Sequence, residues 1–170
     1  EDELILAYAL RGQLERRGAE VVGLAGSGSK ALELCRQTAP EVVLMDIRMP
    51  EVDGITATRM IMEHCPASVI VITAYADEAT RAKAEAAGAM GFLAKPVQAE
   101  AVLETIPAAQ KRFAEFQIIQ REAGDLEQAL KTRRLVEVAK AMLAGRGEVS
   151  LDKAFQSLRE RAAKSGSSLQ

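Results

Sequence analysis

The sequence is poor in the residues that form metal cages, disulfide frameworks and aromatic binding surfaces. Two cysteines, Cys35 and Cys65, are too few for a disulfide framework and are typical of a reducing cytosol. A single histidine, His64, excludes a zinc site built from several histidines and a relay that passes through several phosphohistidines. Tryptophan is absent and aromatic residues make up 4% of the chain, so we do not expect bases to stack on an aromatic surface.

Long apolar segments are missing as well. No run approaches the ~18 residues that cross a bilayer, and no segment resembles a signal peptide with a basic start and an apolar middle. Of the 170 residues, 48% are apolar and 27% are charged, which is typical of a soluble globular protein with one large domain, or one domain and a smaller appendage. We therefore expect a cytoplasmic protein without membrane association.

Charge is distributed unevenly along the chain. Residues 1–106 carry 10 lysines and arginines against 16 acidic residues, a net charge of −6, whereas residues 107–170 carry 12 against 8, a net charge of +4. An acidic front part joined to a basic back part indicates two functions. The basic part suits a polyanion, although the solvated surface of a helix carries similar charge.

The first two thirds of the chain alternate between strand and helix patterns. Residues 42–45 and 69–72 are apolar at successive positions, which predicts strands buried on both faces of a parallel sheet. The alternation predicts βαβ units and a doubly wound, flavodoxin-like α/β fold. The expected strands are residues 20–24, 41–46, 68–73 and 90–94, and the expected helices are residues 4–17, 27–37, 54–64 and 77–87.

The start of the chain departs from this alternation. Glu1-Asp2-Glu3 leads directly into a helix, where such a fold would place a strand. In a five-stranded order of the flavodoxin kind the first strand lies in the middle of the sheet, and without it the neighbouring edges would be unpaired. We therefore expect that a first strand upstream was trimmed, and that residues 165–170, which read as a loop, mark a second trimmed end.

From about residue 98 the pattern becomes that of one long helix. Apolar or small residues recur at spacings of 3, 4, 3 and 4, the seam of a coiled coil. Pro107 inside this pattern predicts a kink, or a helix end just before it. The seam consists of Phe116, Ile119, Ala123, Leu126 and Leu130.

Two further helical segments follow, at residues 132–143 and 150–164, and predict a small all-α bundle. The chain then divides into three parts. We expect a sheet domain at residues 1–106, a helical coiled-coil linker at residues 107–131 and a helical domain at residues 132–170.

Polar side chains follow successive strands of the predicted sheet. Asp46 ends the second expected strand, Thr73 ends the third and Lys95 follows the fourth, while Glu1 and Asp2 stand where the first strand would end. The carboxyl ends of parallel strands share one edge of an open sheet, where ligands bind. Each residue alone also suits a helix cap or an ordinary strand position, but the five together predict one pocket.

The chemistry of this pocket follows from its charges. Three close carboxylates repel one another, and a hard divalent cation such as Mg²⁺ lets them stay ionised together. An Asp carboxylate beside Mg²⁺ can act as a nucleophile toward a phosphoryl group, whose charge the metal and a lysine neutralise. The sequence therefore predicts phosphorylation of Asp46.

Residues 1–106 also carry motifs of a known family. The motifs are Glu1-Asp2, Met45-Asp46-Ile47-Arg48-Met49-Pro50 with Asp53-Gly54, Thr73-Ala74 and Lys95-Pro96. Together they resemble the receiver domains of bacterial two-component response regulators.

The resemblance implies that Asp46 accepts a phosphoryl group from the histidine of a sensor kinase. It also implies a switch pair, in which the hydroxyl of Thr73 moves toward the phosphoryl group and the ring of Phe92 turns inward. Without the resemblance, Phe92 is simply an aromatic core residue. The Mg²⁺ ligands that the resemblance implies are Glu1, Asp2, Asp46 and the backbone carbonyl of Arg48.

Residues 126–169 resemble a second family, the ANTAR module of AmiR/NasR-type antiterminators. The matching residues are Arg134-Leu135-Val136, Ala139-Lys140, Leu143, Ala154-Phe155, Leu158, Ala162 and Leu169. Glu148 stands where the family usually has glycine, and the third helix of the family is not found before Gln170.

The second resemblance implies a helical bundle that, as a homodimer, binds paired RNA hairpins in nascent messenger RNA and prevents termination. Arginine and lysine suit such a partner because they bind phosphate and stack on loop bases. Solvated helices carry the same residues without binding RNA. The candidate RNA contacts are Arg133, Arg134, Lys140, Arg146, Arg159 and Lys164.

These observations favour a regulator, not an enzyme, whose RNA-binding antitermination output is switched when a sensor histidine kinase phosphorylates Asp46. One alternative is a phosphorelay or dimerisation adaptor that binds no RNA. A DNA-binding regulator is less favoured, because about six residues separate the last two helical segments and a helix-turn-helix has a shorter turn. A phosphohydrolase of the haloacid dehalogenase kind would need an aspartate at position 48, where this chain has arginine.

Overall fold

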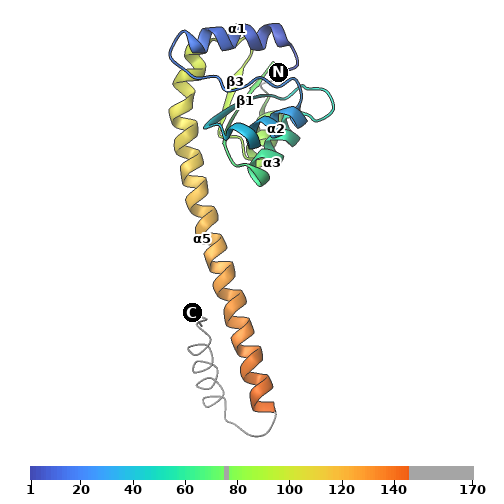
Figure 1. Ribbon diagram of the computed structural model, residues 1–170, viewed down its shortest axis with the longest axis vertical. Helices are drawn as coiled ribbons and strands as arrows, with labels where there is room; N and C mark the ends of the chain where they lie inside the picture. The colour runs from blue at the N-terminus through green and yellow to red at the C-terminus, as the bar shows by residue number, and fades with distance from the viewer. Residues whose placement is uncertain (75–76, 146–170) are drawn as a thin grey trace. The chain divides into compact units, whose positions relative to one another are not determined.

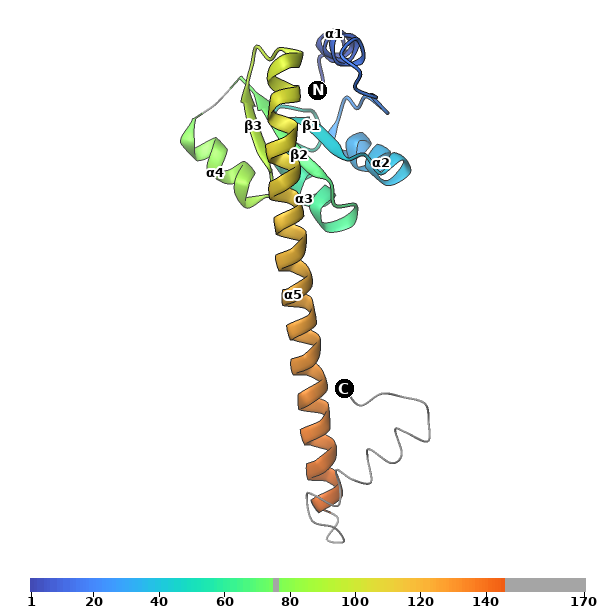
Figure 2. The ribbon, with the colours of Figure 1, turned by 90° about the vertical axis from the view of Figure 1, so that its left-hand side faces the viewer.

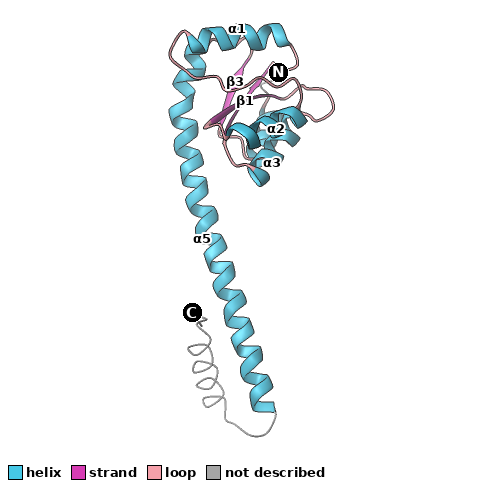
Figure 3. Ribbon diagram, viewed as in Figure 1, coloured by secondary structure: helices cyan, strands magenta, loops and turns pink. Residues whose placement is uncertain are grey.

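A three-stranded parallel sheet forms the centre of the first part of the chain (Figures 1 and 3). The computed structural model describes residues 1–74 and 77–145, with side chains up to residue 139. The strands are β1 (Val42–Asp46), β2 (Ser68–Thr73) and β3 (Gly91–Ala94), in the order β1-β2-β3. The strands expected at 41–46, 68–73 and 90–94 are confirmed, and every residue of β2 is buried, as its continuous apolar run predicts.

Five helices are described around and beyond this sheet. The four expected helices of the first part are confirmed, and three of them begin at a polar cap. Ser27, Asp53 and Asp77 accept hydrogen bonds from backbone N–H groups of the first helical turn that follows each of them. The helices are α1 (Leu4–Glu15), α2 (Gly28–Thr38), α3 (Gly54–His64), α4 (Glu78–Ala86) and α5 (Ala99–Gly145).

Helices lie on both faces of the sheet (Figure 2), and alternate residues of the strands belong to core clusters on opposite faces. Met45 and Val71 pack with Ile61 of α3 in one core cluster, which also receives residues of α2 and α4. Leu44 and Ile70 belong to clusters on the other face, which contain residues of α5. Helices on both faces of a parallel sheet make the fold doubly wound, as expected.

The strand expected at residues 20–24 is wrong, because residues 21–25 adopt no regular secondary structure. A strand exists only where its backbone pairs with a neighbour. Within the described part of the chain, β1 forms the edge of the sheet and no strand lies beyond it. A groove of about 990 Å³ separates this segment from the edge of β1, with Val21, Leu44 and Val102 among its lining residues.

Helix α5 continues through Pro107, so the expectation of a helix end before this residue is wrong. Proline lacks the N–H that would bond to the fourth preceding carbonyl. Val102 and Ala109, on either side of Pro107, are fully buried in the core, and their packing offsets that loss. Residues 132–143 belong to the same helix rather than to a separate one, and the segment expected at 150–164 lies outside the described residues.

The chain divides into two compact units, Glu1–Phe116 and Gln117–Gln170. Phe116 is the first residue of the predicted coiled-coil seam. It is partly buried and packs against the core cluster of Ile70, Met90 and Ala109. The apolar seam residues beyond it are exposed. No helix among the described residues combines the length and the apolar character that crossing a membrane requires.

Candidate functional site

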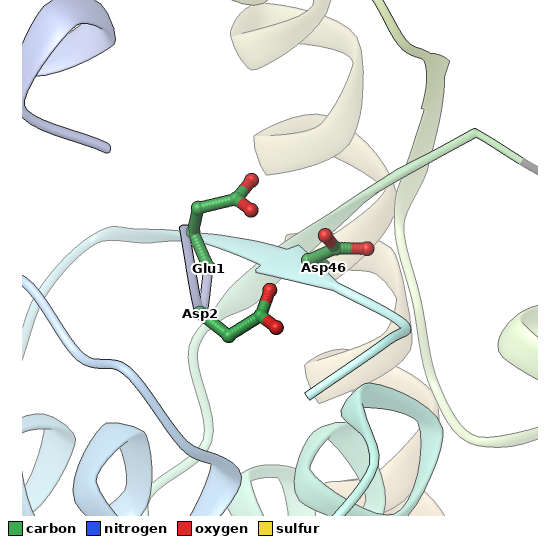
Figure 4. Close-up of side chains that lie close together, drawn as sticks. All are labelled: Glu1, Asp2 and Asp46. Carbon is green, nitrogen blue, oxygen red and sulfur yellow. The ribbon is translucent and has the colours of Figure 1, made fainter. Parts of the chain in front are cut away.

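Three carboxylates gather at the carboxyl edge of the sheet (Figure 4). Asp46 is the last residue of β1, while Glu1 and Asp2 precede α1. One oxygen from each side chain lies within 4.8 Å of the others. Asp46 is only 6% exposed, so its charge needs compensation by a cation. The predicted acidic cluster is thus present, with a donor set of carboxylate oxygens that suits Mg²⁺.

Lys95 provides a positive charge in this cluster. Its Nζ lies 2.6 Å from Oε2 of Glu1 and also contacts the Asp46 carboxylate. Its backbone N–H donates to the Thr73 carbonyl at 2.8 Å, which holds the backbone of Lys95 beside the end of β2. Burial acts to lower the pKa of Lys95, but the carboxylates of Asp46 and Glu1 outweigh burial and hold this pKa above its usual value.

The loop after β1 wraps tightly around Asp46. The backbone N–H of Arg48 donates to Oδ1 of Asp46 at 3.2 Å. Gly54 begins α3 here, and a Cβ atom on this residue would lie 1.8 Å from the Asp46 carbonyl oxygen. Arg48 therefore approaches Asp46 through its N–H, while its carbonyl stays a predicted metal ligand.

Thr73 and Phe92 lie on neighbouring strands. Phe92 pairs in register with Val71, two residues before Thr73, so the two side chains point to the same face of the sheet. Thr73 is 1% exposed at the end of β2. This arrangement suits a pair in which one side chain responds to the other, although the switch itself stays a prediction.

Sequence reasoning missed two features of this site. The guanidinium of Arg81, on α4, lies over the Phe92 ring, 5.9 Å from its centre. Nothing in the spacing of the sequence singles out Arg81, because the contact joins an exposed helix position to a strand. The close approach of Gly54 to Asp46 was missed too, although the Asp53-Gly54 pair at a helix start could have indicated it.

The predicted RNA contacts are described only in part. Arg133 and Arg134 lie on α5 and are exposed. Lys140 also lies on α5, but its side chain is outside the described residues, as are Arg146, Arg159 and Lys164.

Comparisons with known proteins match both parts of the chain. The family model "Response regulator receiver domain" matches residues 1–107, and the model "ANTAR domain" matches residues 124–170. The transcriptional regulatory protein PdtaR of Mycobacterium tuberculosis is 35% identical over 162 residues, which cover 95% of this chain and 79% of PdtaR.

Solved structures match the first part. The response regulator domain of CheB from Thermotoga maritima gives a TM-score of 0.61 at 30% identity, covering 65% of this chain and 92% of that domain. A CheX–CheY–BeF3–Mg²⁺ complex from Borrelia burgdorferi gives a TM-score of 0.59 at 29% identity, covering 62% of this chain and 81% of the matched one.

Proposed function

Because the chain belongs to the response regulators that join a receiver domain to a C-terminal ANTAR domain, we propose that phosphorylation of Asp46 by a sensor histidine kinase switches its RNA-binding output. The observation that carries this proposal is the convergence of Glu1, Asp2 and Asp46 with Lys95. A regulator of this kind acts in the cytoplasm, where its kinase and its RNA are.

Asp46 is the nucleophile in the proposed reaction. A carboxylate oxygen attacks the phosphorus, and the bond from phosphorus to the kinase histidine breaks. Lys95 already contacts this carboxylate, so its ammonium can follow the negative charge as that charge moves onto the transferred group. The hydroxyl of Thr73, at the end of the next strand, is the proposed donor to a phosphoryl oxygen.

Glu1, Asp2, Asp46 and the Arg48 carbonyl are the proposed Mg²⁺ ligands. When bound, Mg²⁺ neutralises charge on the phosphoryl oxygens. The residues present fit this ion, because carboxylate and carbonyl oxygens are the ligands it prefers. They converge without a histidine or cysteine ligand among the described groups, which disfavours zinc.

The nucleophile is tested by labelling the full chain with acetyl phosphate in the presence of Mg²⁺. Asp46→Asn should abolish uptake, since the amide cannot attack. Asp53→Asn is the matched control, because Asp53 is an exposed carboxylate of the same loop that caps α3. If Asp46→Asn takes up phosphoryl groups as the wild type does, the assignment of Asp46 is wrong.

The proposed output depends on the second unit. Arg133 and Arg134 lie in this unit, and their exposed positive charges suit contact with RNA phosphates. Paired-hairpin RNA should bind more tightly after acetyl phosphate and Mg²⁺ treatment, with an affinity that falls as salt rises. Replacing both arginines by glutamine should weaken binding and reduce the salt dependence. Absence of RNA binding would favour the adaptor, and preference for duplex DNA would favour the DNA-binding alternative.

Dimerisation is the proposed link between phosphorylation of Asp46 and RNA binding by the second unit. Ile119, Leu126 and Leu130 are 63%, 64% and 54% exposed, and their helical spacing suits a second copy of α5. Leu126→Asp should reduce the molar mass of the phosphorylated protein in light scattering from that of a dimer to that of a monomer. An unchanged mass, whether monomeric or dimeric in both proteins, would remove this link.

A further inference from the structure

The fold brings the two cysteines of the chain into contact. Cys35 lies on α2 and Cys65 caps the end of α3, two helices that lie side by side against the sheet (Figures 1 and 2). The thiol of Cys35 donates to the carbonyl oxygen of Cys65, with Sγ and O 3.3 Å apart. Both cysteines line one surface cavity of about 290 Å³. Contact between residues so distant in sequence comes from the packing of α2 on α3.

The two thiols have different surroundings. Cys35 is 3% exposed and belongs to the core cluster of Leu32 and Ala57. Burial, with a smaller contribution from Cys65, raises the pKa of the Cys35 thiol to about 12. Cys65 is half-buried and lines the cavity together with Arg36 and His64. An oxidant in solvent therefore reaches Cys65, while Cys35 stays protonated behind it.

A shared metal ion does not explain this pair. Among the described residues, Cys35, Cys65 and His64 do not form a set of three converging ligands. Structural metal sites for soft ligands need about four. A disulfide needs only the two sulfur atoms and a short distance between the two backbones.

We propose that Cys35 and Cys65 form an intrachain disulfide in response to a peroxide. In the first step the Cys65 thiolate attacks an oxygen of hydrogen peroxide, the O–O bond breaks and hydroxide leaves, which yields a sulfenic acid on Cys65. In the second step Cys35 attacks the Cys65 sulfur, an S–S bond forms and the S–O bond breaks. The departing hydroxide takes the proton of Cys35 as water, so two thiols are oxidised and one peroxide is reduced to two waters.

The disulfide would close a loop that contains β1 and Asp46. It would nevertheless lie near the amino end of β2, away from the carboxyl ends of the strands where Asp46 stands. Cys65 comes shortly before Ser68, where β2 begins, whereas Asp46 ends β1. We therefore expect the crosslink to raise the thermal midpoint of unfolding, because it restricts the unfolded chain. Phosphoryl uptake on Asp46 should stay within about twofold, so this inference stands or falls independently of the proposed phosphorylation.

The test uses the full chain, reduced and then exposed to hydrogen peroxide. Intact mass and thiol titration under denaturing conditions should show loss of both thiols and of two hydrogens within one chain. Cys35→Ser removes the resolving thiol, so Cys65 should accumulate as a sulfenic acid that dimedone traps. Cys65→Ser leaves the buried thiol, which should react on the order of a hundredfold more slowly than Cys65 does.

Three results would overturn the proposal. Both thiols of the wild type could remain titratable, the crosslinks could join separate chains only, or Cys65→Ser could be oxidised as fast as Cys35→Ser. Intact mass and thiol titration of the wild type decide whether the disulfide forms, even if a variant fails to fold. Cys35→Ala offers a second replacement that suits the apolar surroundings of Cys35.

Discussion

The ammonium group of Lys95 lies 2.6 Å from the carboxylate of Glu1, and both side chains are 21% exposed. The lysine follows β3, and the glutamate begins the chain. Their contact forms because the start of the chain lies at the carboxyl edge of the sheet, where Lys95 follows the end of β3. Since Lys95 also contacts Asp46, one cation holds two of the three carboxylates of the acidic cluster together.

Lys95→Met should destabilise the protein and tighten Mg²⁺ binding. Removal of the ammonium leaves Glu1 and Asp46 without their cation, at a cost of about 1–3 kcal/mol. Mg²⁺ no longer competes with the lysine for these carboxylates, so its dissociation constant should fall. Urea unfolding and titration with Mg²⁺ check the two effects.

Lys30→Met is the matched control for Lys95→Met. Lys30 pairs with Glu33 on the surface of α2, where both side chains are 53% exposed. Solvent screens this pair, so unfolding and Mg²⁺ binding should not change measurably. Equal effects of the two substitutions would contradict a specific role for Lys95.

Asp53 should stabilise α3 in a pH-dependent way. Partial burial acts to raise the pKa of Asp53, but hydrogen bonds from Thr56 and Ile55 outweigh burial and lower it. A lowered pKa means that the stabilisation is complete above the usual range of an aspartate, near 4, and is lost as pH falls through that range. Asp53→Ala should cost about 1 kcal/mol at pH 7, with a smaller difference from the wild type below pH ~3, as denaturant unfolding would show.

Asp53→Asn provides the comparison, because the amide oxygen still caps the helix. It should retain most of the stability at pH 7 and show a weaker dependence on pH. A loss at Asp53→Ala that stays the same down to acid pH would contradict a role for the carboxylate charge.

Gly54→Ala should damage the start of α3. The added Cβ would lie 1.8 Å from the carbonyl oxygen of Asp46, so the backbone must move at the cost of about 3 kcal/mol. Phosphoryl uptake should fall as well, because the same movement displaces Asp46. Gly124→Ala on α5 is the opposite control. Beyond the backbone of the helix itself, its added Cβ meets no atom within 4 Å. Gly124→Ala should therefore stabilise the helix by about 0.5–1 kcal/mol in thermal unfolding.

Arg81 should be energetically coupled to Phe92. A guanidinium over an aromatic ring at an exposed site contributes about 0.5–1 kcal/mol. A double-mutant cycle with Arg81→Ala and Phe92→Leu measures this coupling and cancels the separate ion pair of Arg81 with Glu85. A coupling energy near zero would show that the ring is held by the core alone.

Much of the sheet and of its acidic site could be predicted from the sequence. The apolar runs that became β1 and β2 are local patterns, and a parallel sheet is the arrangement that buries both faces of such strands. Asp46, Thr73 and Lys95 could be found because each stands at or just after a strand end. Once the strands are parallel, their ends meet at one edge without further information.

Other features depended on tertiary contacts. Residues 20–24 have the composition of a strand, but hydrogen bonds to a neighbour make a strand, and the described sheet offers them none. Pro107 would interrupt an isolated helix, yet core packing on both sides carries α5 through it. Phe116 fits a coiled-coil repeat, but it packs beside Met90 instead.

The sequence by itself therefore determined the three segments that form β1, β2 and β3 and the groups that follow them at the carboxyl edge, because periodicity and strand ends are local properties. Only the tertiary structure decided that Cys35 meets Cys65 and that Arg81 covers Phe92. Cys35 and Cys65 lie on two helices separated by β1, and Arg81 reaches Phe92 from the helix that precedes its strand. The packing of the helices on one another and on the sheet, which no local pattern encodes, sets both distances.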